Sequence, residues 1–516
     1  MTEALDADWD VIVIGTGIGG GTAGRALAEA GRRVLFLEAG RAGHRREETR
    51  IDAAAIDPVA RAVRGLWPDP LSVTLDGETA DAFAPLGAGI GGSSVFYAAT
   101  LEAPEPHDVE DRPGRPHPTG GWPISWADLA PDLARARALY HVHGTADPLS
   151  EHAPDLPAPP PLAPGERALA DRLTAAGLHP YRLHAALRYL SGCTECLGRK
   201  CPRDCKMDGR SAGVEPALAT GRAAIVTGAE VTRLIADGDR VTGVELRHGG
   251  ASRTLAAPQI VLAAGALNSP RLMLASAQEG WPDGLGNRHG HVGRGLMFHL
   301  NETFALWPGR AAAFDGPSKA IGFRDLYFAE GQRLGMVQAM GIDVGYGEIL
   351  HVLRQRLARS PLRRLPAAGE LARLPAAAAA RAMGTAKVFV GLLEDLPDPG
   401  NRVRSDPARP DRIAIEYRVT DELKARRTLF RRLIRQRLKG ERIAFLSHRP
   451  EPNLGHPCGT LRMAHRAEEG VTDGAGRVHG LRNLAVADAS LFPTSMGVNP
   501  SLTIAVLALR VARGIT

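Results

Sequence analysis

A glycine-rich turn between two apolar segments constrains the fold of this 516-residue chain more than any other feature of its sequence. The segment VIVI is typical of a short buried strand, and Gly15, Gly17 and Gly20 follow it with the spacing G-x-G-x-x-G at the start of a helical segment. The first glycine allows a tight turn, the second lets the backbone approach a pyrophosphate, and the third lets the helix pack closely on the strand. The sequence therefore predicts a strand–helix–strand unit that binds a dinucleotide.

An acidic residue completes this unit. Glu38 ends the second strand segment, RRVLFLE, at the spacing where a carboxylate accepts hydrogen bonds from the hydroxyls of a ribose. A carboxylate at this point disfavours a ribose that carries a 2′-phosphate. The cofactor is therefore predicted to be NAD or FAD, and the glycine turn alone does not distinguish the two.

The length of the chain fits a protein that can bury its cofactor completely. A chain of 516 residues exceeds the length at which one hydrophobic core keeps growing, so we expect one large two-part domain or two interleaved domains. The acidic start, MTEALDADWDV, lacks the basic region and apolar stretch of a signal peptide. The chain has no run of about 18 uncharged apolar residues that would span a membrane. We therefore expect a cytoplasmic protein without a transmembrane segment.

Four further motifs distinguish between the two cofactors. They are a second glycine-rich loop, GAGIGGSSVFYAATLE, then IVLAAGALNSPRLMLAS, then HPCGTLRMA, and finally GRVHGLRNLAVADASLFPTSMGVNPSLTIAVLAL near the end of the chain. In this order they resemble the glucose-methanol-choline (GMC) family of flavoprotein oxidoreductases. The resemblance extends from about Asp8 to the C-terminus and omits only the stretch near 346–384.

The resemblance implies an α/β fold with two parts. One is a Rossmann-like FAD-binding domain, of the kind found in GMC proteins and cholesterol oxidase, and the other is an α+β substrate-binding domain. We expect the FAD-binding domain to be discontinuous, over 8–120, 208–302 and 450–516, and the substrate-binding or cap region to cover 121–207 and 303–449.

The resemblance also implies which residues contact FAD. Gly15, Gly17, Gly20 and Glu38 would bind the dinucleotide, and a residue of the segment AEVTRL would contact the adenine through its backbone. Near the end of the chain, an acid would hold the flavin side, and a turn with the helix start after it would place backbone dipoles beneath the ring. The adenine contact would be Val231, the acid Asp488, and the turn and helix start would contain Pro500 and Thr503. Gly91, Gly92 and Ser93 of the second glycine loop would also approach the cofactor.

Two side chains are candidates for catalysis. Oxidation of an alcohol needs a base for the hydroxyl proton, because an alkoxide releases hydride far more readily than the neutral alcohol. A second polar group must hold the same oxygen so that the C–H bond points at the flavin. His456 in HPCGT matches the base, and Asn499 in GVNPS matches the position that relatives fill with His or Asn.

Two departures from the family pattern concern cofactor attachment and a second base. Many relatives carry Asn or His after the second glycine loop, where this chain has Phe96 and Tyr97. A histidine that could bond covalently to the flavin is therefore missing, and the prediction is non-covalent FAD. Glu394 and Asp395 lie in the region where some sterol-acting relatives place a second base, but nothing in their spacing shows that role, and we expect a structural role.

Four cysteines crowd into the segment 193–205 with the pattern C-x2-C-x4-C-x3-C: Cys193, Cys196, Cys201 and Cys205. In a cytosolic protein such density indicates metal or redox chemistry more often than a permanent disulfide. Three of them, Cys196, Cys201 and Cys205, are similar in spacing to the iron-sulfur ligands of flavin-dependent glucose dehydrogenases. Such a cluster would imply electron transfer to an acceptor protein. A zinc site and simple packing stay open as alternatives.

The positive charge of the chain is concentrated in one segment. Between 346 and 384, seven arginines (354, 356, 359, 363, 364, 373 and 381) stand against Glu348 and Glu370. The net charge of +6 therefore does not indicate nucleic-acid binding. Leucines at helical spacing among these arginines favour a solvated helical face that packs on the substrate region, with peripheral contact to an anionic membrane or to an acidic partner as alternatives.

These patterns predict an enzyme that oxidises a primary or secondary alcohol to an aldehyde or ketone. Two other functions stay open at this point: a flavin-dependent lyase or decarboxylase, and a non-catalytic flavin-binding interaction protein. The sequence does not distinguish an oxidase from a dehydrogenase, and it does not indicate the oligomeric state. The substrate is likewise open among sterols, sugars, polyols and long-chain alcohols.

Overall fold

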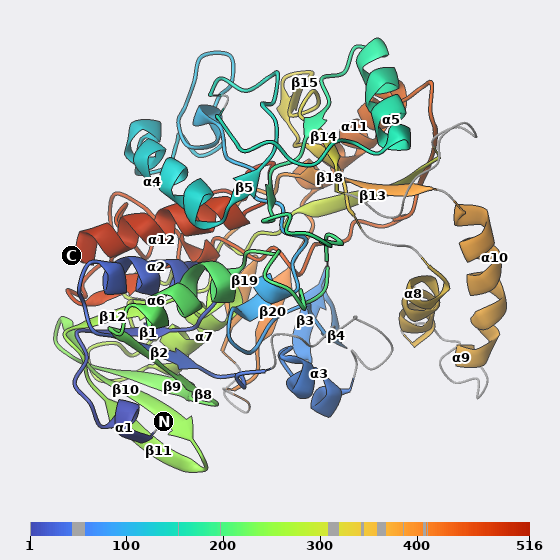
Figure 1. The fold of residues 1–516 in the computed structure, drawn as a ribbon. Coiled ribbons are helices and arrows are strands. Elements are labelled where there is room, and N and C mark those ends of the chain that lie inside the picture. The colour runs from blue at the N-terminus through green and yellow to red at the C-terminus, as the bar shows by residue number, and fades with distance from the viewer. Residues whose placement is uncertain are drawn as a thin grey trace.

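The computed structural model describes residues 2–43, 57–152, 154–196, 198–307, 319–341, 345–358, 368–384, 386–405, 409 and 411–515. A parallel sheet near both termini and an antiparallel sheet farther from them organise this part of the chain (Figure 1). The predicted α/β class with a Rossmann-like half is confirmed.

The parallel sheet has five strands in the order β22-β12-β1-β2-β8. The central strand β1 is buried along its whole length between β2 and β12. Runs of Val, Ile and Leu without alternating polar residues form such strands because both faces of the sheet are covered. The bounds are β1 (Val11–Ile14), β2 (Val34–Glu38), β8 (Ala223–Thr227), β12 (Gln259–Leu262) and β22 (Leu484–Val486).

Helices cover one face of this sheet and a small antiparallel sheet lies on the other side (Figure 1). α2 (Ile18–Glu29) packs against α12 (Ser501–Ile515), and α4 (Trp126–Leu139) lies next to α12. The predicted strand–helix–strand unit is present, and two strands of the small sheet form an antiparallel hairpin over 230–248. The small sheet consists of β9 (Glu230–Asp237), β10 (Arg240–His248) and β11 (Ala251–Leu255).

The second large sheet has six strands in the order β21-β13-β18-β17-β14-β6. Because side chains alternate along a strand, its two faces differ. Phe304 and Phe389 on one face pack with Phe430 of α11 (Asp421–Arg437), whereas Asn301 and Gln338 belong to the face that lines a cavity. The bounds are β6 (Tyr181–Arg182), β13 (Leu300–Trp307), β14 (Ile321–Phe323), β17 (Val337–Ala339), β18 (Lys387–Leu393) and β21 (Arg442–Phe445).

A four-stranded sheet joins segments that are far apart in the sequence. β3 (Leu71–Leu75) pairs with β4 (Glu78–Ala82) on one side and with β20 (Ala414–Tyr417) on the other, and β19 (Arg402–Arg404) completes the sheet. The first part of the chain is therefore interleaved with the region after 303 in this sheet.

The remaining elements are short or peripheral. The motif IVLAAGALNSPRLMLAS forms most of β12 and the whole of α7 (Gly265–Ala275). None of the described helices is long and apolar enough to cross a membrane. The other elements are α1 (Thr2–Leu5), α3 (Pro58–Arg64), α5 (Pro164–Ala175), α6 (Glu215–Ala219), β5 (Val142–His143), β7 (Ala185–Ala186), β15 (Phe328–Ala329) and β16 (Gln332–Arg333).

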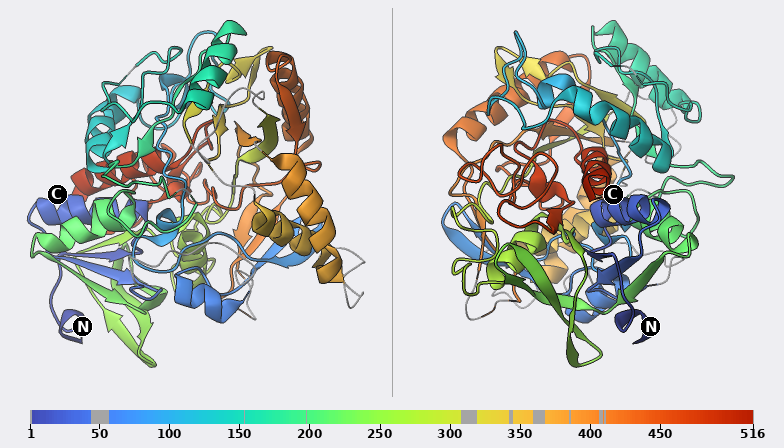
Figure 2. Two further views of the ribbon diagram at one scale, coloured as in Figure 1. Left: turned by 45° about the vertical axis from the view of Figure 1, so that its right-hand side comes forward. Right: turned by 90° about the vertical axis from the view of Figure 1, so that its left-hand side faces the viewer.

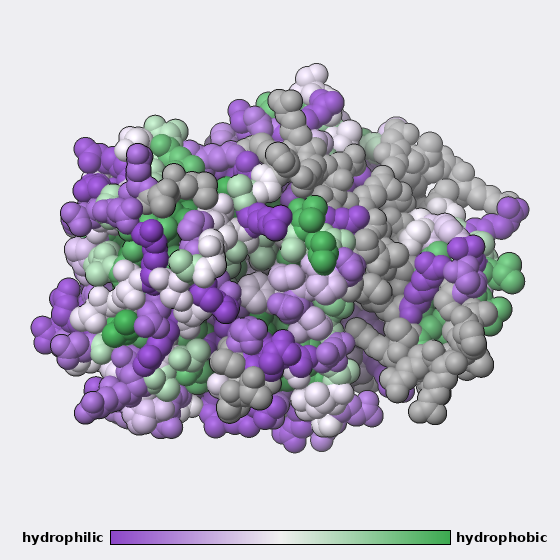
Figure 3. Space-filling view, turned by 90° about the horizontal axis from the view of Figure 1, so that it is seen from below, coloured by the Kyte–Doolittle hydropathy of each residue, from purple (hydrophilic) through white to green (hydrophobic). Residues whose placement is uncertain are grey.

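The basic segment forms a helical projection at the edge of the molecule (Figure 2). It contains α8 (Tyr346–Ala358), α9 (Ala368–Leu371) and α10 (Arg373–Met383). Glu370 pairs with Arg354 and Arg373, so part of the positive charge is compensated within the segment. On the face shown in Figure 3, hydrophobic residues lie scattered among hydrophilic ones. Arg359, Arg363 and Arg364 lie outside the described residues.

Candidate functional site

A cavity of about 450 Å³ lies between the carboxyl ends of the parallel strands and the inner face of the six-stranded sheet. Cofactors of open α/β sheets bind at this end of the strands. Ten of the residues predicted to form the site line this cavity: Gly15, Gly17, Glu38, Gly92, Ser93, Val231, His456, Asp488, Asn499 and Pro500. The other three, Gly20, Gly91 and Thr503, are not part of its lining.

The three glycines of the first turn differ in what surrounds them. Gly15 has φ +98°, a conformation that favours glycine, and a Cβ there would lie 2.4 Å from the carbonyl oxygen of Ala263. A Cβ at Gly20 would lie 2.1 Å from the carbonyl oxygen of Gly15, so Gly20 permits close packing of α2. A Cβ at Gly17 would meet no protein atom within 4 Å. Of the three, Gly17 alone therefore leaves open space beside the backbone.

Glu38 is held in a defined orientation at the end of β2. Its carboxylate accepts hydrogen bonds from the Thr16 hydroxyl at 2.5 Å and from the Gly40 N–H at 2.9 Å. Burial raises the pKa of Glu38, and these hydrogen bonds oppose that shift. The Ala229 N–H bonds to the Glu38 carbonyl at 2.9 Å, which places the start of β9 and Val231 beside the same end of the cavity.

The second glycine loop packs directly on the first. Gly91 and Gly92 both have positive φ, at +94° and +54°, and a Cβ at Gly92 would lie 3.0 Å from the Cα of Gly17. The hydroxyl of Ser93 accepts a hydrogen bond from the Gly87 N–H at 2.9 Å and closes the loop. The two loops therefore form one continuous backbone wall of the cavity.

Asp488 is the hub of a buried cluster between α7 and the segment before α12. Its carboxylate accepts hydrogen bonds from the Gly265 N–H at 2.9 Å, the Ser269 hydroxyl at 2.6 Å and the Ser490 N–H at 2.9 Å. Burial raises the pKa of Asp488, and these donors oppose the shift. Asp488 therefore ties the start of α7 to the wall of the cavity.

The protonation pattern of His456 follows from a chain of hydrogen bonds. His456 Nδ1 lies 3.0 Å from His299 Nδ1, and His299 Nε2 lies 2.9 Å from the carbonyl oxygen of Met496. A carbonyl oxygen only accepts, so His299 carries its proton on Nε2. Burial lowers the pKa of His299 to about 4, so the ring is neutral and its Nδ1 is an acceptor. His456 therefore donates from Nδ1, and its Nε2 keeps the lone pair that a base requires.

The same surroundings keep His456 neutral. Burial lowers the pKa of His456 well below its ordinary value, and positive charge on His299 or Lys319 lowers the pKa further. At neutral pH the imidazole is thus able to accept a proton.

Asn499 presents an unpaired oxygen at the cavity. Its Oδ1 is buried and has no hydrogen-bond partner among the described residues. A buried amide oxygen without a partner is unfavourable, so it is typical of a position that receives a ligand donor. Pro500 follows, and α12 begins at Ser501 with its N-terminus toward the cavity. The Thr503 hydroxyl donates to the Met496 sulfur at 3.9 Å and supports the turn from behind.

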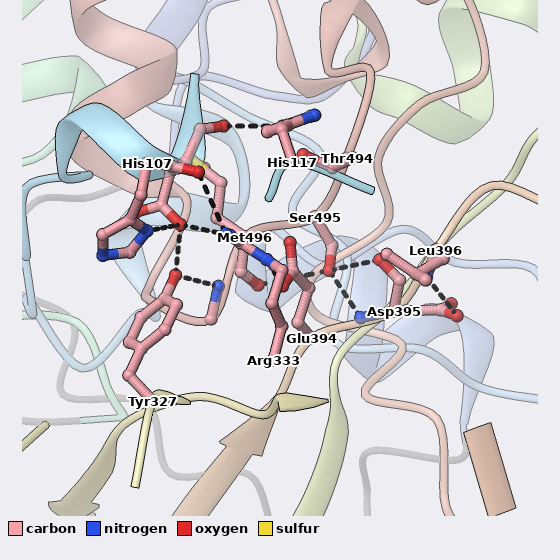
Figure 4. A network of polar contacts seen from close by, with 12 residues as sticks. His107, His117, Tyr327, Arg333, Glu394, Asp395, Leu396, Thr494, Ser495 and Met496 are labelled. Carbon is pink, nitrogen blue, oxygen red and sulfur yellow. Dashed lines mark hydrogen bonds and ion pairs between the residues drawn. The ribbon is translucent and has the colours of Figure 1, made fainter. Parts of the chain in front are cut away.

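A buried network holds the turn that carries Asn499 (Figure 4). The hydroxyl of Tyr327 accepts a hydrogen bond from the Gly497 N–H at 2.6 Å and donates to the Asp108 carboxylate at 2.5 Å. The Ser495 hydroxyl accepts from the Asp395 N–H at 2.8 Å. Met496, between them, has φ +61°, which costs about 1–3 kcal/mol for a residue other than glycine. The network therefore stabilises a strained turn whose carbonyl orients His299.

Glu394 and Asp395 have the structural roles expected of them. Glu394 forms a buried ion pair with Arg333 at 2.8 Å (Figure 4). The Asp395 carboxylate accepts hydrogen bonds from the Phe298 N–H at 2.9 Å and the Tyr417 hydroxyl at 2.6 Å. Neither residue lines the cavity. Because Phe298 precedes His299, Asp395 fixes the backbone beside the histidine pair.

Gly198 of the cysteine segment lines the cavity, and the described residues of the segment form no metal site. Cys196, Cys201 and Cys205 pack together with Cys193, and all four are free thiols. Among the described residues, no group of three or more His, Cys, Asp and Glu side chains is arranged to hold a metal ion. The iron-sulfur cluster suggested by the spacing is therefore not supported. Burial raises the pKa of Cys193 to about 12, which keeps it a thiol.

Comparison with known proteins assigns the family. Two GMC oxidoreductase models match the chain, one over residues 169–301 and the other over residues 397–508. The chain belongs to the GMC oxidoreductase family. The protein is accordingly an FAD-dependent oxidoreductase that acts on CH–OH groups.

Relatives and a solved structure agree with this assignment. The chain is 28% identical to paromamine 6′-oxidase of Streptomyces fradiae, over 100% of this chain and 92% of the relative. It is 29% identical to 2-methyl-1,2-propanediol dehydrogenase of Mycolicibacterium austroafricanum, over 99% of this chain and 95% of the relative. The fold is similar to that of pyridoxine 4-oxidase from Mesorbium loti, with a TM-score of 0.61 and 21% identity over 98% of this chain and 99% of that one.

The residues of this GMC protein fit FAD. Open space beside Gly17 leaves room for a pyrophosphate, and the oriented carboxylate of Glu38 suits a ribose diol. The unpaired oxygen of Asn499 lies in the same cavity. Phe96 and Tyr97 also line it, and the Tyr97 hydroxyl donates to the Met207 carbonyl.

Sequence reasoning missed several polar residues of the site. Thr16, which orients Glu38, lies inside the glycine motif and could have been noticed there. His299 lies just before β13 and Asn301 lies within it, and Lys319 and Gln338 have no motif at all. An alternation of polar and apolar residues in FHLNETFALW was the one available signal for His299 and Asn301.

Alanine at two glycines separates cofactor approach from folding. Gly17→Ala should abolish FAD binding while the apoprotein unfolds at nearly the wild-type temperature, because the added Cβ fills only open space. Gly20→Ala should destabilise the apoprotein itself by about 1–3 kcal/mol, because its Cβ would overlap the Gly15 carbonyl. Thermal unfolding of the apoproteins and flavin absorbance of the purified proteins check this; equal unfolding temperatures for the two variants would contradict it.

Proposed function

We propose that His456 is the catalytic base of this GMC oxidoreductase and that Asn499 holds the alcohol oxygen. The observation that carries the proposal is the hydrogen-bond chain from the Met496 carbonyl through His299, which leaves the lone pair of His456 on Nε2. Both side chains line one cavity, where the side-chain amide N–H of Asn499 can donate to the alcohol oxygen while the hydroxyl proton goes to His456.

Each step of the proposed mechanism belongs to a named atom. His456 accepts the hydroxyl proton on Nε2 and becomes an imidazolium whose Nδ1–H stays bonded to His299. The side-chain amide N–H of Asn499 donates to the substrate oxygen, so the C–H bond keeps one direction as the proton leaves. Bound FAD supplies the hydride acceptor. The apolar residues of the cavity, such as Val390 and Leu392, exclude water from the reacting carbon.

We further infer that FAD is bound without a covalent link. Phe96 and Tyr97 occupy the lining next to the second glycine loop, and neither can form a histidyl bond to the flavin. Binding then rests on the two glycine loops, Glu38 and the start of α12. The cytoplasmic location stays a prediction from the sequence.

His456→Ala should abolish alcohol oxidation while the protein keeps its FAD. Anaerobic mixing with an alcohol that reduces the wild-type flavin should then leave the flavin absorbance of the variant unchanged. In the wild type, burial lowers the pKa of His456, so kcat/KM should persist at pH values below 6.5, where an ordinary imidazole is protonated. Asn499→Ala serves as the comparison and should retain residual reduction. Full reduction of the His456→Ala flavin would overturn the role of His456.

The role of His299 can be tested with two substitutions of nearly equal size. His299→Asn keeps an acceptor near Nδ1 and should retain most of the activity, whereas His299→Leu should lower kcat about tenfold with little change in KM, as expected for the loss of one orienting hydrogen bond. A purely structural role for this buried position would make Leu at least as active as Asn. Steady-state kinetics at saturating and limiting alcohol distinguishes these outcomes.

A further inference from the structure

The wall of the cavity formed by the six-stranded sheet carries three polar side chains that the proposed mechanism does not use. Asn301 lies in β13 and Gln338 in β17, while Lys319 lies two residues before β14. In the sheet, Asn301 is opposite Leu392 and Gln338 is opposite Val390. All five residues line the same cavity as His456 and Asn499.

The two amides have unpaired oxygens. Asn301 Oδ1 and Gln338 Oε1 are buried, and neither has a hydrogen-bond partner in the described part of the chain. Gln338 is 2% exposed, so bulk water does not compensate it. Leaving a buried amide oxygen unpaired costs about 1–3 kcal/mol. With Asn499, three such oxygens surround one space, and a ligand with several hydroxyl donors would satisfy them together.

Lys319 supplies the positive charge of this wall. It is 8% exposed, and its amine makes no hydrogen bond or ion pair with the described residues. Burial lowers its pKa to about 7, and the nearby carboxylate of Glu102 opposes that shift. Glu102 is itself bound by Arg324 at 2.8 Å and by the Tyr181 hydroxyl at 2.8 Å, so it does not neutralise Lys319 directly.

The other charged groups that line the cavity lie away from this wall. Glu38 lies at the end of β2 and Glu230 at the start of β9, and the Asp488 carboxylate is occupied by its own donors. Among the described residues of the sheet wall, Lys319 therefore carries the charge, and His456 is its titratable neighbour.

We propose that Asn301, Lys319 and Gln338 determine specificity for a polyhydroxylated alcohol that is neutral or anionic. This inference rests on the proposed alcohol oxidation and names its substrate class. Hydroxyls beyond the reacting one donate to the two amide oxygens, and a hydroxyl or carboxylate oxygen accepts from the Lys319 amine. An apolar alcohol leaves these groups unpaired, and an ammonium group on the substrate is repelled by Lys319.

Four compounds with six carbons and a primary hydroxyl separate these effects: sorbitol, gluconate, 1-amino-1-deoxysorbitol and 1-hexanol. The wild-type protein should oxidise sorbitol and gluconate with kcat/KM at least tenfold above the values for the amine and for 1-hexanol. The advantage of gluconate over sorbitol should shrink as the pH rises from about 6 to 8, because Lys319 loses its charge near pH 7.

Two variants of similar size assign the effects to residues. Lys319→Met should remove the discrimination between gluconate and the amine, and should keep the preference for sorbitol over 1-hexanol. Gln338→Met should do the opposite. Met340→Leu, an apolar change of similar size in the lining of the same cavity, is the control and should change neither ratio. Retained FAD absorbance shows that each variant folds.

Binding measurements keep this inference separate from the proposed chemistry. Calorimetry without oxygen gives the dissociation constants of the four compounds for the oxidised, FAD-bound His456→Ala variant and for the oxidised wild-type protein. These constants should follow the same order as the kcat/KM values. If none of the compounds reduces the flavin but the order of binding holds, the proposed oxidation fails and the inference stands. Tighter binding or faster oxidation of 1-hexanol than of sorbitol, or unchanged discrimination in Lys319→Met, would overturn it.

Discussion

The hydrogen bond between the two histidine rings is the interaction on which the proposed chemistry of this protein depends. An imidazole has two nitrogens, and only one of them can serve as a base when the ring is neutral. The Met496 carbonyl fixes the proton of His299, and His299 in turn fixes the proton of His456. The Met496 carbonyl thus determines, through His299, that Nε2 is the nitrogen of His456 proposed to act as the base.

That carbonyl is positioned by both large regions of the fold. Met496 belongs to the turn before α12, which packs on the parallel sheet, whereas Tyr327, which binds Gly497, comes from the region of the antiparallel sheet. The left-handed conformation of Met496 is held by hydrogen bonds to its two neighbours in the sequence, from Asp395 to Ser495 and from Gly497 to Tyr327. The interleaving of the two parts of the chain therefore accounts both for the cavity between the sheets and for the orientation of His456.

The sequence predicted the parts of the site that depend on local backbone geometry. The spacing of Gly15, Gly17 and Gly20 requires a turn between strand and helix, and Glu38 has to end the next strand, so these features follow from neighbours in the chain. His456 and Asn499 were identified through motifs that resemble a family. Lys319 and Gln338 were missed because only the pairing of β14 with β17 brings their segments together, which leaves no local pattern, and Asn301 was missed because a short alternation in FHLNETFALW is its only signal. The iron-sulfur interpretation relied on spacing, and spacing does not determine whether thiols converge on one point.

The most direct measurement of the central claim is a crystal structure of the oxidised protein with FAD and an unreacted alcohol. We expect the alcohol oxygen to lie within about 3.2 Å of both His456 Nε2 and the side-chain amide of Asn499, with the His299 ring still between His456 and the Met496 carbonyl. An alcohol oxygen bound to other groups, or a His456 ring turned so that Nε2 faces His299, would contradict the account.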